Sequence, residues 1–257
     1  MAIILVVLVV GAGLGYEFYL SLPVSAVNNT SGFWSGYVVE APKGAVTNVT
    51  GSWVVPAVVC GKGDANNLLL WVGIDGWNGT TSEQTVEQIG TRTDCLHGNA
   101  VYYAWYEFVP PGNASGNTTR LDNITIAPGD RVRTSVSGNP LSKSFLMTIT
   151  DLRTGISSHA EGVLPAALLT TADWIAEAPR VGGTPFTMSN FNSVTFASNM
   201  ATVLGQSKAL NTFPDHGLVN ASRITYLCPD NQAKAIPSSM TNGDDSFKVM
   251  WGAGGNC

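Results

Sequence analysis

The sequence predicts an all-β protein built as an antiparallel sandwich or barrel. Short runs rich in Val, Ile, Thr, Tyr, Phe and Trp recur at spacings near ten residues, which is typical of strands in such folds. Gly, Pro, Asn and Asp separate the runs, as at Gly129-Asp130 and Asn139-Pro140. Crossover helices are missing between most runs, which disfavours a parallel sheet.

Each expected strand is a β-type run bounded by turn residues. In chain order the expected strands are 32–39, 46–55, 68–74, 84–91, 101–109, 123–126, 131–137, 144–151, 156–161, 172–178, 193–196, 223–227 and 247–251. The best helix candidate is the short segment 163–171.

Composition limits the possible partners. The 257 residues include 13 Lys and Arg against 18 Asp and Glu, a net charge of −5, and only 12% of residues are charged. With so few basic residues, binding to nucleic acid is not expected. Hydrophobic residues make up 44% of the chain, which is enough for a real core.

The N-terminus differs from the rest of the chain. Residues 1–15 carry no charge and are mostly aliphatic or Gly, and Val24-Ser25-Ala26 resembles a signal-peptidase site. We therefore expect residues 1–26 to be a secretory signal, or alternatively a membrane anchor, and residues 27–257 to form one domain. Either alternative places the domain outside the cytoplasm, and we expect a secreted protein.

Four cysteines and several glycosylation sequons agree with export. An even number of cysteines in an exported protein suggests disulfides. We expect Cys60–Cys95 and Cys228–Cys257, although three connectivities are possible. The N-x-[ST] sequons begin at Asn28, Asn29, Asn48, Asn78, Asn113, Asn117, Asn123 and Asn220.

Common catalytic constellations are missing from the sequence. It contains no G-x-S-x-G, H-E-x-x-H, P-loop or G-x-G-x-x-G motif, and its three histidines have no ligand spacing. We therefore expect neither a metal nor a cofactor. The remaining candidates for chemistry are amides, carboxylates and tryptophans within strands.

Strand alternation groups these candidates by face. Gln88 shares a face with Val86 and Gly90, whereas Glu87 points the other way. Glu177 shares a face with Asp173 and with apolar Ile175, and an apolar setting raises the pKa of a carboxyl group, which suits a general acid or base. In 103–107, Tyr103, Trp105 and Glu107 share a face that could form an aromatic-walled groove.

Eight segments in this order resemble the glutamic peptidases, or eqolisins. They are 31–37 (S-G-F-W-S-G-Y), 49–56 (V-T-G-S-W-V-V-P), 71–76 (W-V-G-I-D-G), 86–90 (V-E-Q-I-G), 103–107 (Y-A-W-Y-E), 124–130, 173–177 (D-W-I-A-E) and 191–196. Each motif is weak alone, but the ordered set is specific. It covers residues 31–227, and Asp173 stands where the family usually has Glu.

The resemblance implies a sandwich of two seven-stranded antiparallel sheets and a Gln/Glu catalytic dyad. Carried over by motif, the dyad is Gln88 and Glu177. It implies a pepstatin-insensitive acid endopeptidase, acting as a monomer on polypeptides. Groove and site residues would include the following: Trp34, Trp71, Asp75, Trp105, Glu107 and Asp173.

Two other function classes fit the same composition. A glycoside hydrolase on a similar sandwich would need two carboxylates flanking the bond, for which Glu107 with Glu177, or Glu83 with Glu87, are candidates. A secreted carbohydrate- or peptide-binding module would use the Trp and Tyr side chains as platforms and would have no turnover.

Overall fold

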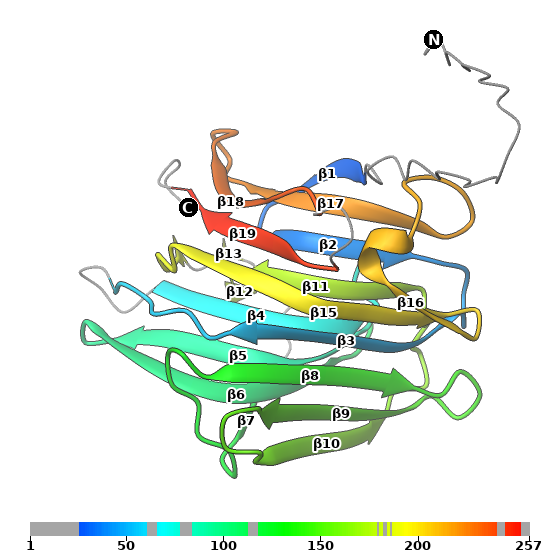
Figure 1. The fold of residues 1–257 in the computed structure, drawn as a ribbon, viewed down its shortest axis with the longest axis horizontal. Coiled ribbons are helices and arrows are strands. Elements are labelled where there is room, and N and C mark those ends of the chain that lie inside the picture. Colours follow the sequence, from blue (N-terminus) through cyan, green and yellow to red (C-terminus); the bar gives the residue numbers. More distant parts are fainter. Residues whose placement is uncertain are drawn as a thin grey trace, which may run out of the picture.

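Two stacked β-sheets form the body of the protein in this computed structural model (Figure 1). The structure describes residues 26–60, 66–77, 84–112, 118–178, 180–181, 184–185, 187–240 and 245–252. The predicted all-β sandwich is confirmed: within these ranges, the helical structure is a single 3₁₀ turn, Leu210–Thr212.

The first sheet carries most of the residues singled out in the sequence. Its strand order is β1 (Val27–Ser31), β17 (Asn220–Leu227), β2 (Trp34–Glu40), β11 (Thr171–Glu177), β4 (Asn66–Ile74), β5 (Val86–Leu96), β6 (Asn99–Val109) and β7 (Thr119–Leu121). All these neighbours are antiparallel except β1 and β17, which are parallel.

The second sheet covers the inner face of the first. Its order is β18 (Ala233–Pro237), β19 (Phe247–Trp251), β15 (Ser193–Val203), β3 (Val46–Val54), β8 (Arg131–Gly138), β9 (Ser144–Asp151) and β10 (Ser157–Val163). Short strands flank the two sheets: β12 (Arg180–Val181), β13 (Thr184–Pro185), β14 (Thr187–Met188) and β16 (Gln206–Ala209).

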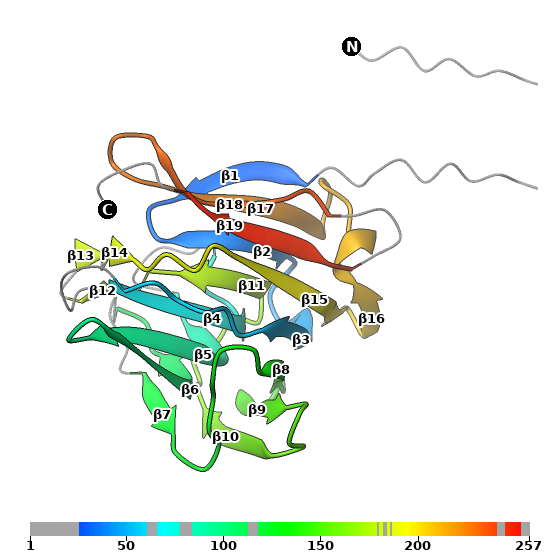
Figure 2. The same ribbon diagram turned by 60° about the vertical axis from the view of Figure 1, so that its left-hand side comes forward.

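The two sheets are joined by hydrogen bonds at one edge. β17 of the first sheet pairs with β18 of the second through Tyr226–Ala235 and Leu227–Ala233. Figure 2 shows β1 beside β17 at this end of the fold and β7 and β10 at the opposite end. The described residues show no pairing between β7 and β10.

The main hydrophobic core lies between the sheets. Val72, Ile89 and Trp174 come from the first sheet and pack toward Trp53 and Phe196 of the second. A second apolar cluster lies on the outer face of the first sheet. A sheet with apolar clusters on both faces explains why nearly every residue of β2, β4 and β11 is buried.

Two sequence predictions of secondary structure are wrong. Segment 163–171 is not a helix: after β10 it runs as a turn and irregular chain, with Leu169 at φ 55°. The backbone N–H groups of residues 168–170 donate to Asp75, which prevents helical pairing. Segment 123–126 is also irregular and does not form a strand. Ile124 and Ile126 are nevertheless buried, and they anchor this loop to the core.

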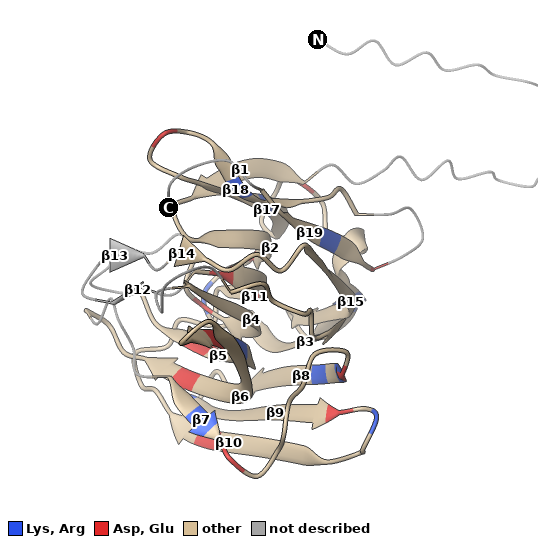
Figure 3. Ribbon diagram, turned by 90° about the vertical axis from the view of Figure 1, so that its left-hand side faces the viewer, with Lys and Arg blue, Asp and Glu red and all other residues tan. Residues whose placement is uncertain are grey.

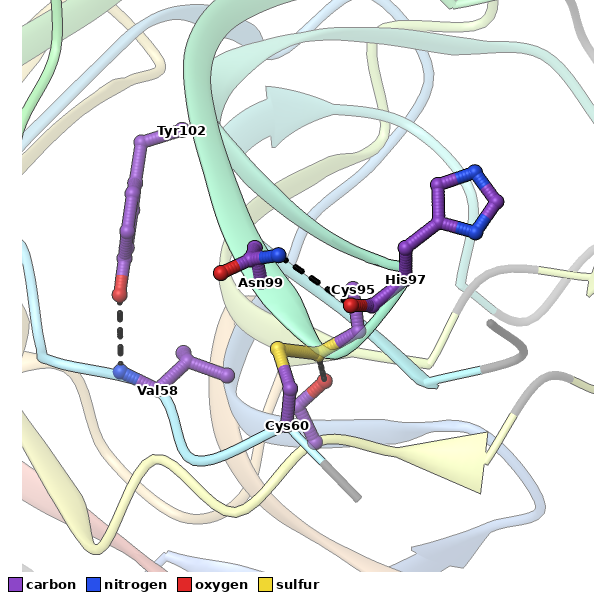
Figure 4. The surroundings of a disulfide bond; sticks show 7 residues. Val58, Cys60, Cys95, His97, Asn99 and Tyr102 are labelled. Carbon is purple, nitrogen blue, oxygen red and sulfur yellow. Dashed lines mark hydrogen bonds between the residues drawn. A yellow bond between two sulfur atoms is a disulfide. The ribbon is translucent and has the colours of Figure 1, made fainter. Parts of the chain in front are cut away.

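The predicted Cys60–Cys95 disulfide is present (Figure 4). Cys95 is fully buried at the end of β5, and Tyr102 of β6 fixes the approach to Cys60 by accepting a hydrogen bond from the backbone N–H of Val58 (2.9 Å). Cys228 also forms a disulfide. Its predicted partner Cys257 lies outside the described residues.

Several other predictions fall outside the described residues, namely those on residues 1–25 and on Glu83, Asn78, Asn113 and Asn117. In the part of the chain that is described, no helix has the length and apolar character needed to cross a membrane.

Candidate active site

The outer face of the first sheet gathers the predicted dyad. Gln88 of β5 lies opposite Gly73 of β4, and Glu177 of β11 lies opposite Leu69 of β4. Directly paired residues project to the same side of a sheet, so Gln88 and Glu177 share the outer face. Trp71 of β4 lies between their two levels. The apolar floor of this face comprises Trp34, Val38, Leu69, Trp71, Val86, Trp105, Ile175 and Ile224.

Glu177 is held by a buried tryptophan. Nε1 of Trp71 donates a hydrogen bond of 2.8 Å to Oε2 of Glu177. Trp71 is fully buried and packs edge-on against Trp34, with ring centroids 5.0 Å apart. Trp34 in turn stacks on Trp77. Because this aromatic group fixes the indole, it also fixes one oxygen of the carboxylate.

Gln88 is held by a carboxyl group. Nε2 of Gln88 donates a hydrogen bond of 2.8 Å to Oε2 of Glu107 on β6. Both side chains are buried, and burial raises the pKa of Glu107 to about 7, although the Gln88 hydrogen bond and the Arg92 charge act to lower it. Glu107 is therefore largely neutral in acid and still orients the Gln88 amide.

Two glycines keep the floor open near the dyad. A Cβ atom at Gly90 would lie 1.9 Å from the carbonyl oxygen of Leu70, so the close approach of β4 and β5 requires glycine. A Cβ atom at Gly73 would meet the Trp71 ring at 2.9 Å. Gly90 lies opposite Trp71, midway between the levels of Gln88 and Glu177, and carries no side chain into that space.

Asp75 is enclosed by its own chain. Its carboxylate accepts hydrogen bonds from the backbone N–H groups of residues 168–170, and from the hydroxyl groups of Thr170 and Thr85. Asp75 follows β4 with φ 63°, which is uncommon outside glycine. It therefore ties the 164–170 loop to the end of β4.

Asp75 belongs to a buried group of acids with Glu87 and Asp173. Burial raises the pKa of Glu87 and of Asp173 well above the usual values, and the charge of Asp75 raises both further. Asp173 lies level with Gly73, but it is fully buried and its Oδ2 accepts a hydrogen bond from Thr171. Figure 3 shows that most of the ribbon carries neither Lys or Arg nor Asp or Glu.

The structure places most of the predicted site residues on one face. Trp34, Trp71, Trp105 and Glu107 lie on the outer face with the dyad, and Asp173 shares this face because it pairs with Gly73 in the row of Gln88. Asp75 instead follows the end of β4, where the backbone of residues 168–170 donates hydrogen bonds to it. Within the described ranges, no group of three or more His, Cys, Asp or Glu side chains could hold a metal ion.

Sequence reasoning missed two arginines on the same face. Arg92 is two positions beyond Gly90 on β5, so the alternation that groups Gln88 with Gly90 also includes Arg92. Arg120 of β7 lies opposite Trp105. Segment 119–121 is too short to be recognised as a strand from its pattern, so no sequence signal pointed to Arg120.

Comparison with known proteins identifies the family. Residues 32–251 match the Peptidase A4 family. The chain belongs to this family. Among curated proteins, Aspergillopepsin-2 of Aspergillus niger is 29% identical over 180 residues, which are 68% of this chain and 56% of that protein. The chain therefore matches little more than half the length of this Peptidase A4 relative.

Solved structures agree on the fold. Scytalido-glutamic peptidase, solved with a transition state analog inhibitor, superposes with a TM-score of 0.67 at 22% identity, covering 86% of this chain and 98% of that one. Aspergilloglutamic peptidase from Aspergillus niger has a TM-score of 0.56 at 27% identity, covering 72% and 99%. Membership of the Peptidase A4 family supports a peptidase function.

Proposed function

We propose that this protein is a secreted acid endopeptidase whose catalytic dyad is Gln88 and Glu177. The observation that carries the proposal is the pair of supports on one open face: Trp71 donates to Glu177, and Glu107 accepts from Gln88. Rigid supports of this kind hold reacting groups in position, which is where much catalytic power originates.

The proposed mechanism uses one ionisable group, Glu177, and one group that does not ionise, Gln88. Ionised Glu177 removes a proton from a bound water, whose oxygen attacks the scissile carbonyl carbon. Glu177 then delivers that proton to the amine nitrogen as the C–N bond breaks. In both steps, Nε1 of Trp71 donates a hydrogen bond to one carboxylate oxygen of Glu177.

Gln88 stabilises the negative charge that develops on the carbonyl oxygen. A glutamine amide has two N–H donors, and Glu107 takes one, which leaves the second for the oxyanion. One such donor contributes roughly 3 kcal/mol to the transition state. Because an amide does not titrate, Gln88 keeps this role in acid, and only Glu177 must remain ionised.

The test is hydrolysis of an unfolded protein between pH 2 and 7, with pepstatin present. Wild type should cleave in acid, whereas Glu177→Gln and Gln88→Ala should each lose roughly 100-fold or more in rate. Matched controls are Glu161→Gln on β10 and Gln206→Ala on the flanking strand β16, which change exposed residues away from the first sheet and should cleave like wild type.

Two outcomes would contradict the proposal. If wild type cleaves no protein at any pH, the peptidase proposal fails, and glycan hydrolysis or glycan binding becomes the function to assay. If either dyad variant keeps full activity while its fold, checked by circular dichroism, is unchanged, the assignment of the dyad fails.

A further inference from the structure

The floor of the outer face continues past the dyad to a charged edge. Gly90 lies opposite Trp71 on one side and Trp105 on the other, and Trp105 lies opposite Arg120 of β7. These residues form one row across four strands, so Arg120 projects from the same face as the dyad.

Arg120 is held in place but remains open to solvent. Its guanidinium lies over the ring of Tyr103, 5.0 Å from the centroid, and its side chain is 54% exposed. Stacking on an aromatic face restricts the guanidinium while leaving its N–H donors available. Tyr103 is itself fixed, because its hydroxyl donates to Asp94.

The neighbouring charges leave Arg120 free to exchange its partner. Asp94 is engaged by Arg92, whose Nε donates a bond of 2.8 Å, and both side chains are largely buried. Arg120 pairs with Asp122 at 2.8 Å, but that carboxylate is 82% exposed. An exposed pair of this kind contributes little, so a ligand carboxylate can replace Asp122 at small cost.

The distance suits a side chain of an extended substrate. Gly90, at the level between Gln88 and Glu177, is two strands from Arg120, which is about 10 Å at the usual strand spacing. An extended peptide advances about 3.3 Å per residue, so about three residues cover this distance.

We propose that Arg120, stacked on Tyr103, forms a substrate subsite for an acidic side chain two to three residues from the scissile bond. The proposal rests on the proposed peptidase function and deepens it by naming a substrate preference. The recognised group is a carboxylate, which the guanidinium binds by paired hydrogen bonds.

The test uses quenched fluorescent peptides that carry Glu or its neutral isostere Gln at one position from P4 to P4′. At pH 5 a Glu side chain is mostly ionised. Wild type should prefer Glu at one position by about five-fold in kcat/KM, the upper range for a half-exposed ion pair. Arg120→Gln should reduce that ratio to about one. Arg133→Gln, an exposed change on the second sheet, should preserve it.

Binding of the same peptides to Glu177→Gln, followed by tryptophan fluorescence, separates the two proposals. Cleavage without any Glu preference, or a preference that survives Arg120→Gln, overturns the subsite and leaves the peptidase proposal intact. Binding that prefers Glu and depends on Arg120, without cleavage by wild type, supports the subsite and overturns the peptidase proposal. Absence of both cleavage and selective binding overturns both.

Discussion

Nε1 of Trp71 and Oε2 of Glu177 are 2.8 Å apart across the β4–β11 boundary, and the indole is the donor. A completely buried tryptophan thus directs its one polar atom at the carboxylate of the proposed dyad. In the core, Trp53 makes the same kind of bond to the hydroxyl of Thr91 (3.0 Å). The two indoles provide a matched comparison.

Trp71→Phe should lower kcat by about ten-fold or more with little change in KM, because a hydrogen bond to a charged group is lost. Trp53→Phe makes the same chemical change away from the site. It should lower the melting temperature and leave kcat unchanged. Equal losses of kcat in both variants would show that Trp71 acts only through stability.

Glu107 should act on Gln88 as a neutral acceptor. Because burial raises its pKa to about 7, Gln resembles the form that is present in acid. Glu107→Gln should therefore keep most of kcat/KM between pH 3 and 5, whereas Glu107→Ala should lose about ten-fold by freeing the Gln88 amide. Equally large losses in both variants would mean that the charge of Glu107 is required.

Stability should decline from acid toward neutral pH. The pKa of Glu87 is raised by burial and by the charge of Asp75, so the folded state keeps a proton that the unfolded state releases above about pH 4.3. The stabilisation is complete below that pH and is lost as pH rises through the folded-state pKa.

Glu87→Gln should therefore reduce the fall of melting temperature between pH 4 and 7, while the raised pKa values of Asp173 and Glu107 maintain the rest of it. Exposed Glu161→Gln should leave the curve unchanged. A wild-type curve that is already flat would contradict this prediction.

The carboxylate of Asp75 should contribute more to the free energy of unfolding than an exposed carboxylate does. Asp75→Asn keeps the size but loses charge-assisted bonds to the amides of residues 168–170. We expect the free energy of unfolding in urea to fall by about 3 kcal/mol. Asp122→Asn, at an exposed pair, should change it by less than about 1 kcal/mol. Similar values for the two variants would contradict the role of Asp75.

The Cys60–Cys95 bond should stabilise the first sheet. It joins residues 35 positions apart, and closing a loop of that length in the unfolded chain corresponds to about 4 kcal/mol. The double variant Cys60→Ala/Cys95→Ala should unfold at correspondingly lower urea. An unchanged urea midpoint would show that the unfolded chain gains little freedom when the bond is removed.

Local patterns in the sequence predicted much of the candidate site. Alternation correctly grouped Gln88 with Gly90, and Trp105 with Glu107, because side-chain direction in a strand depends on neighbouring residues alone. Alternation could not show that β11 lies between β2 and β4, which brings Trp71 to Glu177. That pairing depends on contacts about 100 residues apart in the chain.

The wrong helix prediction and the missed Arg120 have the same physical origin. Segment 163–171 contains residues compatible with a helix, but Asp75, distant in sequence, captures three of its amides. The sequence did not place Arg120 on a strand because a strand of three residues is too short to show an alternating pattern. Both features are set by tertiary contacts that override local preference.

The pairing of β17 with β18 has a mechanical consequence. Hydrogen bonds join the two sheets along one side, so they cannot separate there without breaking these bonds. Together with the core that packs under the rest of the first sheet, this join limits bending of the proposed catalytic face, and a bound peptide must adapt its own conformation to that face. Selectivity among substrates would follow from the side chains that border a stiff platform, and redesigning those borders would be the direct route to altered specificity.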